Sequence, residues 1–332
     1  MTGTKPKVFY GWWIALTGAL ALFLSTVTIV ILPFGIFAGA IAQEFHAGRA
    51  KISLAFGIHS LTAALCFPIA GRLVDRFGAR RVLIPSMTLL GLILVGSRFL
   101  SGSLWELYVF YFALGTLGGS AGAMPYTVVI SHWFDRRRGL ALSVVMTGMA
   151  VGAIVIPPVA QHLVRTLGWR MSYSVLGIAI LLIPLPLVIA LLKETPESMG
   201  FLPDGDGEAH ASESRLSKPG VAREVGVTLR EAVCTRAFWI MVCVFFLLTA
   251  SVHACFIHLP AVLADRGATA QIAALASSLF GVGMFVGRLG CGYLLDVFFA
   301  PRVSAVLFAA VATGLGFLSV THAISAGFVG AF

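Results

Sequence analysis

The most constraining feature of this chain is a series of long apolar runs, each on the scale needed to cross a lipid bilayer. A transmembrane helix needs about 20 apolar residues. Nine runs reach that scale, at residues 10–40, 53–70, 82–100, 105–133, 140–162, 169–192, 237–262, 270–290 and 303–320. Because lipid offers the backbone no hydrogen-bond partner, such runs fold as helices. The sequence therefore predicts an all-α membrane protein.

Composition supports the same class of protein. Hydrophobic residues make up 58% of the chain and charged residues 11%, whereas soluble domains carry about 25% charged residues. The formal net charge is +9, but the basic residues stand in short segments between apolar runs, which predicts membrane orientation and not nucleic-acid binding. No nucleophile–base pair, phosphate-binding loop or metal-ligand spacing is visible in the sequence. We therefore expect no enzyme activity, no cofactor and no metal.

The distribution of lysine and arginine predicts the orientation of the spans. Cytoplasmic segments of membrane proteins carry an excess of these residues. With a cytoplasmic amino terminus, the outer segments of the first half hold Arg49, Lys51, Arg98, Arg165 and Arg170. The inner segments then hold the larger set, which is Lys5, Lys7, Arg72, Arg76, Arg80, Arg81, Arg136, Arg137 and Arg138. We therefore expect the amino terminus in the cytoplasm.

The chain divides into two apolar parts that share a pattern. Residues 193–236 are polar and rich in Gly, Pro and Ser, which is typical of a solvated linker, and the predicted orientation places this linker loop in the cytoplasm. They separate residues 1–192, with six spans, from residues 237–332, with three spans and the start of a fourth. A shift of 221 positions (292 minus 71) places Gly71 on Gly292, Asp75 on Asp296 and Arg81 on Arg302. Such a duplication predicts two six-helix bundles, the second of which lacks its last helices here.

The charged turn GRLVDRFGARR at residues 71–81 carries a wider resemblance. It is similar to the loop between helices 2 and 3 of the major facilitator superfamily, and a weaker copy stands near residue 292. The resemblance implies the major facilitator fold and a carrier that works by alternating access, with substrate bound between two helical bundles. The sequence reaches Phe332 before the second bundle is complete. We therefore expect that the sequence is a fragment of a working carrier, and the alternative is a truncated remnant that does not transport.

This turn is also predicted to be a gating latch. Gly71 permits a close helix crossing, and Asp75 can accept hydrogen bonds from a helix amino terminus or pair with an arginine. A plain positive-inside anchor would explain the arginines but not a Gly-x-Leu-x-Asp pattern that occurs twice. The predicted latch residues are Gly71, Asp75, Arg76, Gly78, Arg80, Arg81, Gly292, Asp296 and Arg302.

Four segments carry a narrower resemblance. FYGWWIAL, WFDRRRGLALSVVMTGMAVGAIVIPP, GWRMSYSVLG and FIHLPAVLADRG resemble the monocarboxylate-porter and oxalate/formate-antiporter branch. The resemblance implies a small carboxylate as cargo. It is incomplete, because Met284 stands where the animal monocarboxylate porters have an aspartate, and Phe34 stands where they have a lysine.

Arg288 is the predicted counter-charge for that cargo. It precedes Asp296 by eight residues, a rise of about 12 Å along a helix. A guanidinium at that depth is costly unless it faces water or an anion. In the resembling families an arginine at this point binds the substrate carboxylate through a two-pronged contact. The alternative is a long side chain that extends to the inner surface.

Other residues are weaker candidates. His59, His253 and His258 are candidate proton relays, although a lone histidine in a span is more often a packed, hydrogen-bonded residue. Tyr126 and His258 are also candidates for substrate binding, and Tyr126 can instead anchor packing. Small residues four apart let helices approach, so the predicted packing residues are Gly148, Gly152 and Pro157, on a helix that either packs tightly or rocks during transport.

Together these features predict a secondary active transporter of small organic anions, monocarboxylates foremost. We expect a multi-pass protein of a bacterial inner (plasma) membrane, monomeric when full length, with protons as a candidate coupling ion and with no nucleic-acid partner. The alternative cargo class is amphiphilic compounds that the protein would export, in which case Arg288 is structural.

Overall fold

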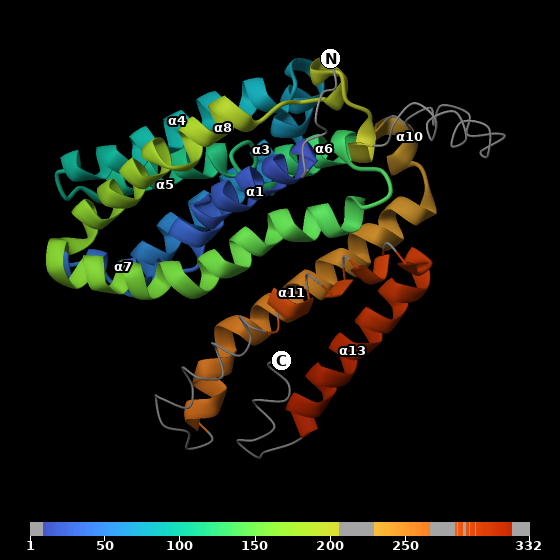
Figure 1. Cartoon of the computed structure of the whole chain (residues 1–332). Helices are drawn as coiled ribbons and strands as arrows, with labels where there is room; N and C mark the ends of the chain where they lie inside the picture. The colour runs from blue at the N-terminus through green and yellow to red at the C-terminus, as the bar shows by residue number, and fades with distance from the viewer. Residues whose placement is uncertain are drawn as a thin grey trace, which may run out of the picture. The chain divides into compact units, whose positions relative to one another are not determined.

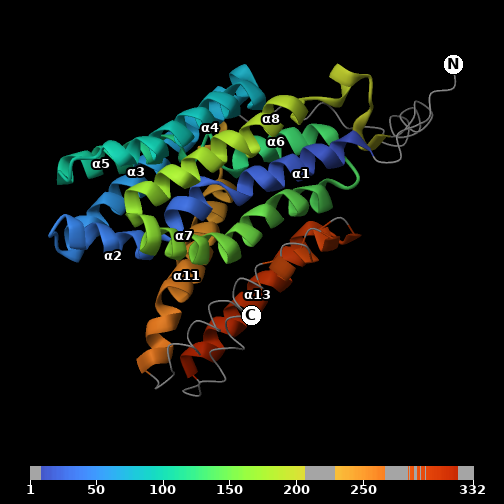
Figure 2. The same cartoon turned by 60° about the vertical axis from the view of Figure 1, so that its left-hand side comes forward.

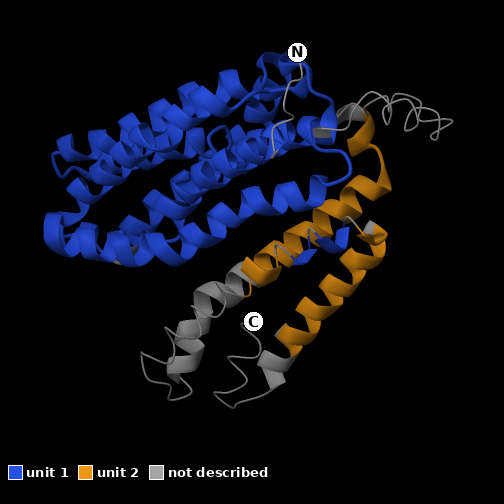
Figure 3. Ribbon diagram, in the orientation of Figure 1, with its two compact units in different colours: residues 1–205, 288–296 blue, residues 206–287, 297–332 orange. Residues whose placement is uncertain are grey.

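The computed structural model describes residues 9–205, 229–265 and 283–320, the last range with gaps at 284, 288, 289, 292 and 296. Across this part of the chain the long elements are helices, and no strand occurs (Figures 1 and 2). The chain forms two compact units (Figure 3). Unit 1 holds Met1–Gly205 with Arg288–Asp296, and unit 2 holds Asp206–Gly287 with Val297–Phe332. The predicted all-α class is confirmed.

The first span is an interrupted helix. It consists of α1 (Tyr10–Phe23), the π-helical turn η1 (Val27–Ile31) and α2 (Phe34–Glu44). At the interruption the Thr28 hydroxyl donates hydrogen bonds to the carbonyl oxygens of Phe23, at 2.8 Å, and Ser25, at 3.0 Å. A backbone carbonyl that leaves the helical ladder inside a membrane needs such a partner, so the threonine makes the break tolerable.

The remaining elements of unit 1 follow in chain order as helices joined by short turns. They are α3 (Arg49–Phe77), α4 (Ala79–Gly96), η2 (Ser97–Phe99), α5 (Leu104–Gly118), α6 (Ala123–Trp133), α7 (Arg138–Leu182), α8 (Pro184–Leu191), η3 (Pro196–Met199) and η4 (Pro203–Gly205). Helix α7 keeps a helical backbone through Pro157 and reverses at Gly168, where φ is 77° and ψ is 165°. This reversal is visible where the ribbon of α7 turns back in Figure 1.

Unit 1 holds six helical stretches whose length and composition suit a membrane crossing. Five stretches of the described residues are long and apolar enough to cross a membrane, which are Tyr10–Ile31, Ala50–Phe77, Ala79–Phe99, Leu104–Trp133 and Arg138–Leu191. The last has 54 residues, about 80 Å of straight helix, whereas the apolar layer is about 30 Å thick. The reversal at Gly168 divides it into two crossings, in agreement with the spans predicted at 140–162 and 169–192.

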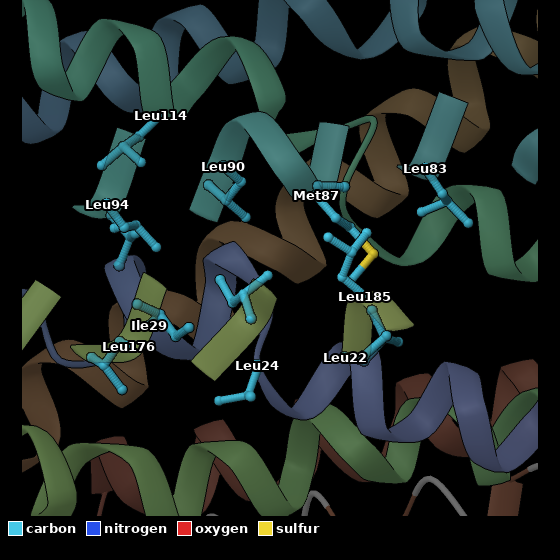
Figure 4. Packing of buried hydrophobic residues seen from close by; sticks show 14 of the residues in the cluster. Leu22, Leu24, Ile29, Leu83, Met87, Leu90, Leu94, Leu114, Leu176 and Leu185 are labelled. Carbon is cyan, nitrogen blue, oxygen red and sulfur yellow. The ribbon is translucent and has the colours of Figure 1, made fainter. Parts of the chain in front are cut away.

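Close helix contacts hold unit 1 together. Helix α7 packs against α1 and α4, and α3 packs against α5, around an apolar core that includes Leu22, Leu90 and Leu176 (Figure 4). A Cβ added at Gly148 would stand 1.7 Å from the Ala19 carbonyl oxygen, and one at Gly152 would stand 2.7 Å from the Phe23 carbonyl oxygen. The backbones of α1 and α7 thus approach closely at the Gly-x-x-x-Gly segment.

The described part of unit 2 contains three helices. They are α10 (Leu229–Val233), α11 (Arg236–Asp265) and α13 (Ala300–Val320). The backbone N–H of Phe238 donates to the Thr235 hydroxyl at 3.3 Å, so Thr235 caps the start of α11. The predicted spans at 237–262 and 303–320 lie within α11 and α13. The predicted span at 270–290 falls largely outside the described residues.

Candidate functional site

Part of the predicted central site falls outside the described part of the chain. Arg288, Gly292 and Asp296 are among the residues left undescribed. The backbones of His253 and His258 belong to α11, but their side chains are not described. Their predicted roles therefore stay predictions. The candidate functional residues whose side chains are described lie in unit 1, at the two ends of its bundle and in its interior.

One end of the bundle is closed by a strap, defined as residues 193–204, which follows α8. The Trp133 indole donates to the carbonyl oxygen of Lys193 at 2.9 Å. The backbone N–H of Arg80 donates to Glu194 Oε1 at 3.0 Å. Just before the strap, the Tyr10 hydroxyl donates to the Leu191 carbonyl oxygen at 2.9 Å. The strap thus joins the ends of α4 and α6, and the end of α8 just before it is bonded to the start of α1.

Gly78 is the residue of the predicted latch that the strap constrains most. Its φ of +86° and ψ of 155° lie in a region that is nearly exclusive to glycine. A Cβ added there would stand 2.3 Å from Glu194 Oε1. The guanidinium of Arg80 also donates to the Ile189 carbonyl oxygen. The structure therefore brings Gly78 and Arg80 together with Glu194, a residue that the latch prediction did not include.

The other latch residues are placed differently. Gly71 is buried against α6, where an added Cβ would stand 2.9 Å from Met124 Cε. Asp75 and Arg81 are exposed, and no hydrogen bond or ion pair joins Asp75 to another described residue. Arg76 is exposed with its Cζ 5.2 Å from the Phe77 ring centre. In unit 2, Arg302 is exposed in the first turn of α13.

A second carboxylate fixes the far end of the strap. Asp204 Oδ2 accepts hydrogen bonds from the backbone N–H groups of Asp135, at 2.9 Å, and Arg136, at 2.7 Å. Asp204 itself has a φ of +58°, which aspartate tolerates better than most residues. The contact ties the strap to the turn before α7. Composition placed this segment in a solvated linker, and only the fold shows that it belongs to unit 1.

Replacing Gly78 with alanine is expected to destabilise unit 1. An ordinary residue in this backbone region costs about 1–3 kcal/mol, and the new Cβ would also displace Glu194. Thermal unfolding of the purified protein in detergent, followed by tryptophan fluorescence, should show a lower midpoint. Gly96→Ala is the matched control, because a Cβ there meets nothing within 4 Å. Equal midpoints for the two variants would contradict the strap contact.

The opposite end of the bundle is joined by a network around Glu44, at the end of α2. The Trp169 indole donates to Glu44 Oε2 at 2.5 Å, and Arg170 forms an ion pair with Glu44 Oε1. Arg170 Nε also donates to the Leu100 carbonyl oxygen at 3.0 Å, and its Cζ lies 4.7 Å from the Trp169 ring centre. Three separate turns of unit 1 are thus held by one arginine and one carboxylate.

The same contacts set the titration of Glu44. Desolvation raises the pKa of its carboxyl, but hydrogen bonds from Arg170 and Trp169, together with the charge of Arg170, outweigh that effect. The pKa of Glu44 therefore lies below its ordinary value of 4.5. A depressed carboxyl pKa stabilises the folded state above the unfolded-state pKa, and this contribution is lost as the pH falls through the folded-state pKa.

Glu44→Gln is expected to lower stability at pH 7 and to lose that effect in acid. Removing the charge weakens a partly exposed ion pair and its hydrogen bonds by about 1 kcal/mol. Wild type should unfold at a higher temperature than the variant at pH 7, and the difference should shrink below about pH 4.5 as Glu44 takes up its proton. A difference that stays constant from pH 7 to pH 4 would show that the charge of Glu44 is not responsible.

Four side chains with polar groups lie in the interior of the bundle. The Tyr126 hydroxyl donates to Met87 Sδ at 3.5 Å and is 1% exposed, so it lies among the packed residues of unit 1. The hydroxyls of Tyr111 and Tyr173 lie 3.1 Å apart. His59 is also 1% exposed. Neither of its ring nitrogens has a hydrogen-bond partner among the described residues.

The comparisons with known proteins agree with this architecture. The family model of the Major Facilitator Superfamily matches residues 14–332. The chain is 28% identical over 302 residues to the MFS-type transporter pytF of Aspergillus terreus, covering 89% of this chain and 92% of that protein. It is also 28% identical over 319 residues to monocarboxylate transporter 11 of Mus musculus. That match covers 95% of this chain but 66% of the mouse protein, so the chain spans less than two thirds of this relative.

A solved transporter shares the fold. The proton:xylose symporter XylE, bound to 6-bromo-6-deoxy-D-glucose, superposes with a TM-score of 0.69 at 16% identity. The match covers 97% of this chain and 79% of that chain. With six crossings in unit 1 and a family match over nearly its whole length, this chain belongs to the major facilitator superfamily of membrane transporters.

Proposed function

We propose that this protein is a secondary active transporter of small organic anions, with monocarboxylates as the foremost cargo. The observation that carries the proposal is Arg288, a cation within the apolar run SLFGVGMFVGRLGCGYLLD. A cation at membrane depth is stabilised by an anion or by water, and a guanidinium matches a carboxylate with two parallel hydrogen bonds. The mouse relative named monocarboxylate transporter 11 supports the same cargo class.

The sequence also argues against a cationic cargo. Asp75, Glu106, Asp265 and Asp296 stand at the ends of predicted spans, and no acidic residue occupies the middle of one. A carrier for cations would need a central carboxylate as counter-charge. We propose further that the protein lies in a bacterial inner membrane with its amino terminus in the cytoplasm, because the lysine and arginine bias of the first half favours that orientation.

A ligand screen on the purified full chain tests this proposal. Thermal unfolding is measured with L-lactate, pyruvate and acetate, each beside its neutral amide, which has nearly the same shape but no charge. A ligand that binds only the folded state raises the midpoint according to its concentration relative to its Kd. The acids are expected to raise the midpoint and the amides are not. Stabilisation by amphiphilic cations, with no effect of the acids, would overturn the proposal and favour an exporter of amphiphiles.

A further inference from the structure

We propose that His59 binds the proton that accompanies the carboxylate, so that the two are carried together. The inference rests on the proposed function. It starts from the position of His59 in α3, ten residues after Arg49 and eighteen before Phe77. At 1.5 Å per residue these separations are about 15 Å and about 27 Å. His59 therefore lies in the middle part of a span, far from bulk water at either end.

Among the described residues, neither nitrogen of the His59 ring has a hydrogen-bond partner. A neutral imidazole presents one donor and one acceptor, and leaving either unpaired in a buried site is unfavourable. Other buried polar groups of the described bundle are paired, such as the Ser97 hydroxyl with the Arg170 carbonyl oxygen at 2.9 Å, or Tyr111 with Tyr173. Besides the His59 nitrogens, the buried side-chain atoms without a partner in this part of the chain are two oxygens, Thr26 Oγ1 and Asp204 Oδ1. Within the described part of the chain, His59 is packed but its ring makes no hydrogen bond, which favours a role in proton binding.

The surroundings of His59 are aromatic and uncharged. The Phe56 ring lies 5.9 Å from the imidazole at an interplanar angle of 14°, and the Tyr111 ring of α5 lies 6.5 Å away at 87°. From α2, Phe34 packs on Phe56. Tyr111 is thus the titratable group that faces the ring, with Tyr173 of α7 bonded behind it. No charged group among the described residues acts on His59.

A proton on His59 would therefore have no fixed counter-charge, and the cargo supplies one. The nitrogen lone pair accepts a proton from water, which makes the imidazolium, and the carboxylate brings one negative charge. With Arg288 charged throughout, the carrier loaded with both has the same net charge as the empty carrier. Binding only the proton or only the carboxylate would change the net charge of the carrier inside the membrane, where an uncompensated charge is unfavourable. Proton and carboxylate must then raise each other's affinity by the same factor.

Proton uptake on ligand binding tests the inference directly. L-lactate, pyruvate and acetate are added to the purified full chain in weakly buffered detergent solution with a pH-sensitive dye. Wild type is expected to take up about one proton per bound acid, and its affinity should fall up to tenfold per pH unit as the pH rises from 6 to 8. His59→Gln, which keeps a donor and an acceptor but does not titrate, should bind the acids without proton uptake and without that pH dependence.

His162→Gln is the matched control, because His162 is an exposed histidine on α7, and it should behave as wild type. Proton uptake that persists in His59→Gln would overturn the inference while the proposed function stands. If none of the three acids binds to wild type, the proposed function fails and the inference fails with it. If gel filtration shows that His59→Gln does not fold, the pH dependence of the wild-type affinity for the acids tests the inference instead. A wild-type affinity that is independent of pH would overturn the inference and leave the proposed function standing.

Discussion

Gly148→Ala is expected to lower the stability of unit 1 by about 3 kcal/mol, the upper part of the usual range for overpacking. A Cβ at this position would stand within 2.7 Å of the carbonyl oxygen, carbonyl carbon and Cα of Ala19. All three are backbone atoms, so no side chain can rotate to make room. The helices α1 and α7 would have to separate. For a unit of about 200 residues this corresponds to a fall of roughly 6–12 °C in the unfolding midpoint.

The control for this prediction is Gly57→Ala in α3. Gly57 is exposed and a Cβ there meets nothing within 4 Å. Alanine favours a helix over glycine by about 1 kcal/mol, so this variant should unfold at the same temperature as wild type or higher. Both midpoints can be read from tryptophan fluorescence in one detergent. If the unfolding midpoint of Gly148→Ala equals those of Gly57→Ala and wild type, the close approach of α1 and α7 is incorrect.

Arg288→Ala is expected to weaken carboxylate binding by at least about 100-fold, or about 2.7 kcal/mol. Removing one partner of a buried ion pair typically costs 2–5 kcal/mol, because the remaining charge stays unpaired. Arg288→Lys should restore only part of the affinity, since a lysine keeps the charge but not the planar fork. The measurement is the Kd of L-lactate, pyruvate and acetate by thermal shift or calorimetry.

Arg98→Ala supplies the comparison for that measurement, because Arg98 is an exposed arginine at a helix end. Its removal should leave the affinity for the acids unchanged. Equal affinities in Arg288→Ala and wild type would remove Arg288 from the binding site. A uniform loss in both arginine variants would instead indicate a general effect of net charge.

The helical framework of unit 1 was predictable because it depends on local pattern. Apolar length alone located the six crossings, since lipid leaves the backbone little choice but a helix. The spacing of Gly148 and Gly152 likewise pointed to a helix face that another helix can approach. These features need no knowledge of which residues meet. The interruption after Phe23 was not predicted, because Thr28 stabilises it through a bond that a span pattern does not reveal.

The strap and the Glu44 network depend on residues that are distant in sequence. The bond from Arg80 to Glu194 joins residues 114 apart, and the bond from Trp169 to Glu44 joins residues 125 apart. Polar composition placed Glu194 and Asp204 in a linker, since composition cannot show that a carboxylate will dock on backbone N–H groups. A signal was nevertheless present, because the acidic and proline-containing KETPES follows directly after a span.

The sequence identified candidate site residues by their type, but it could not predict the hydrogen bonds and the burial of their side chains. Histidine within a span suggested a relay at His59, but the sequence could not say whether its nitrogens were paired. Tyr126 lies in the packed interior with its hydroxyl bonded to Met87, and its role in substrate binding stays a prediction. Arg288 stays a sequence-based prediction.

The hydrophobic core of unit 1 has a consequence for biosynthesis. Among the described residues, those fully buried in this core all lie between Ile14 and Leu192, and Phe201 of the strap packs against them. The sequence continues for at least 140 residues (332 minus 192) after Leu192. At about 5–20 residues per second their translation takes roughly 7–28 s. The first half can therefore assemble in the bilayer while the ribosome is still making the second.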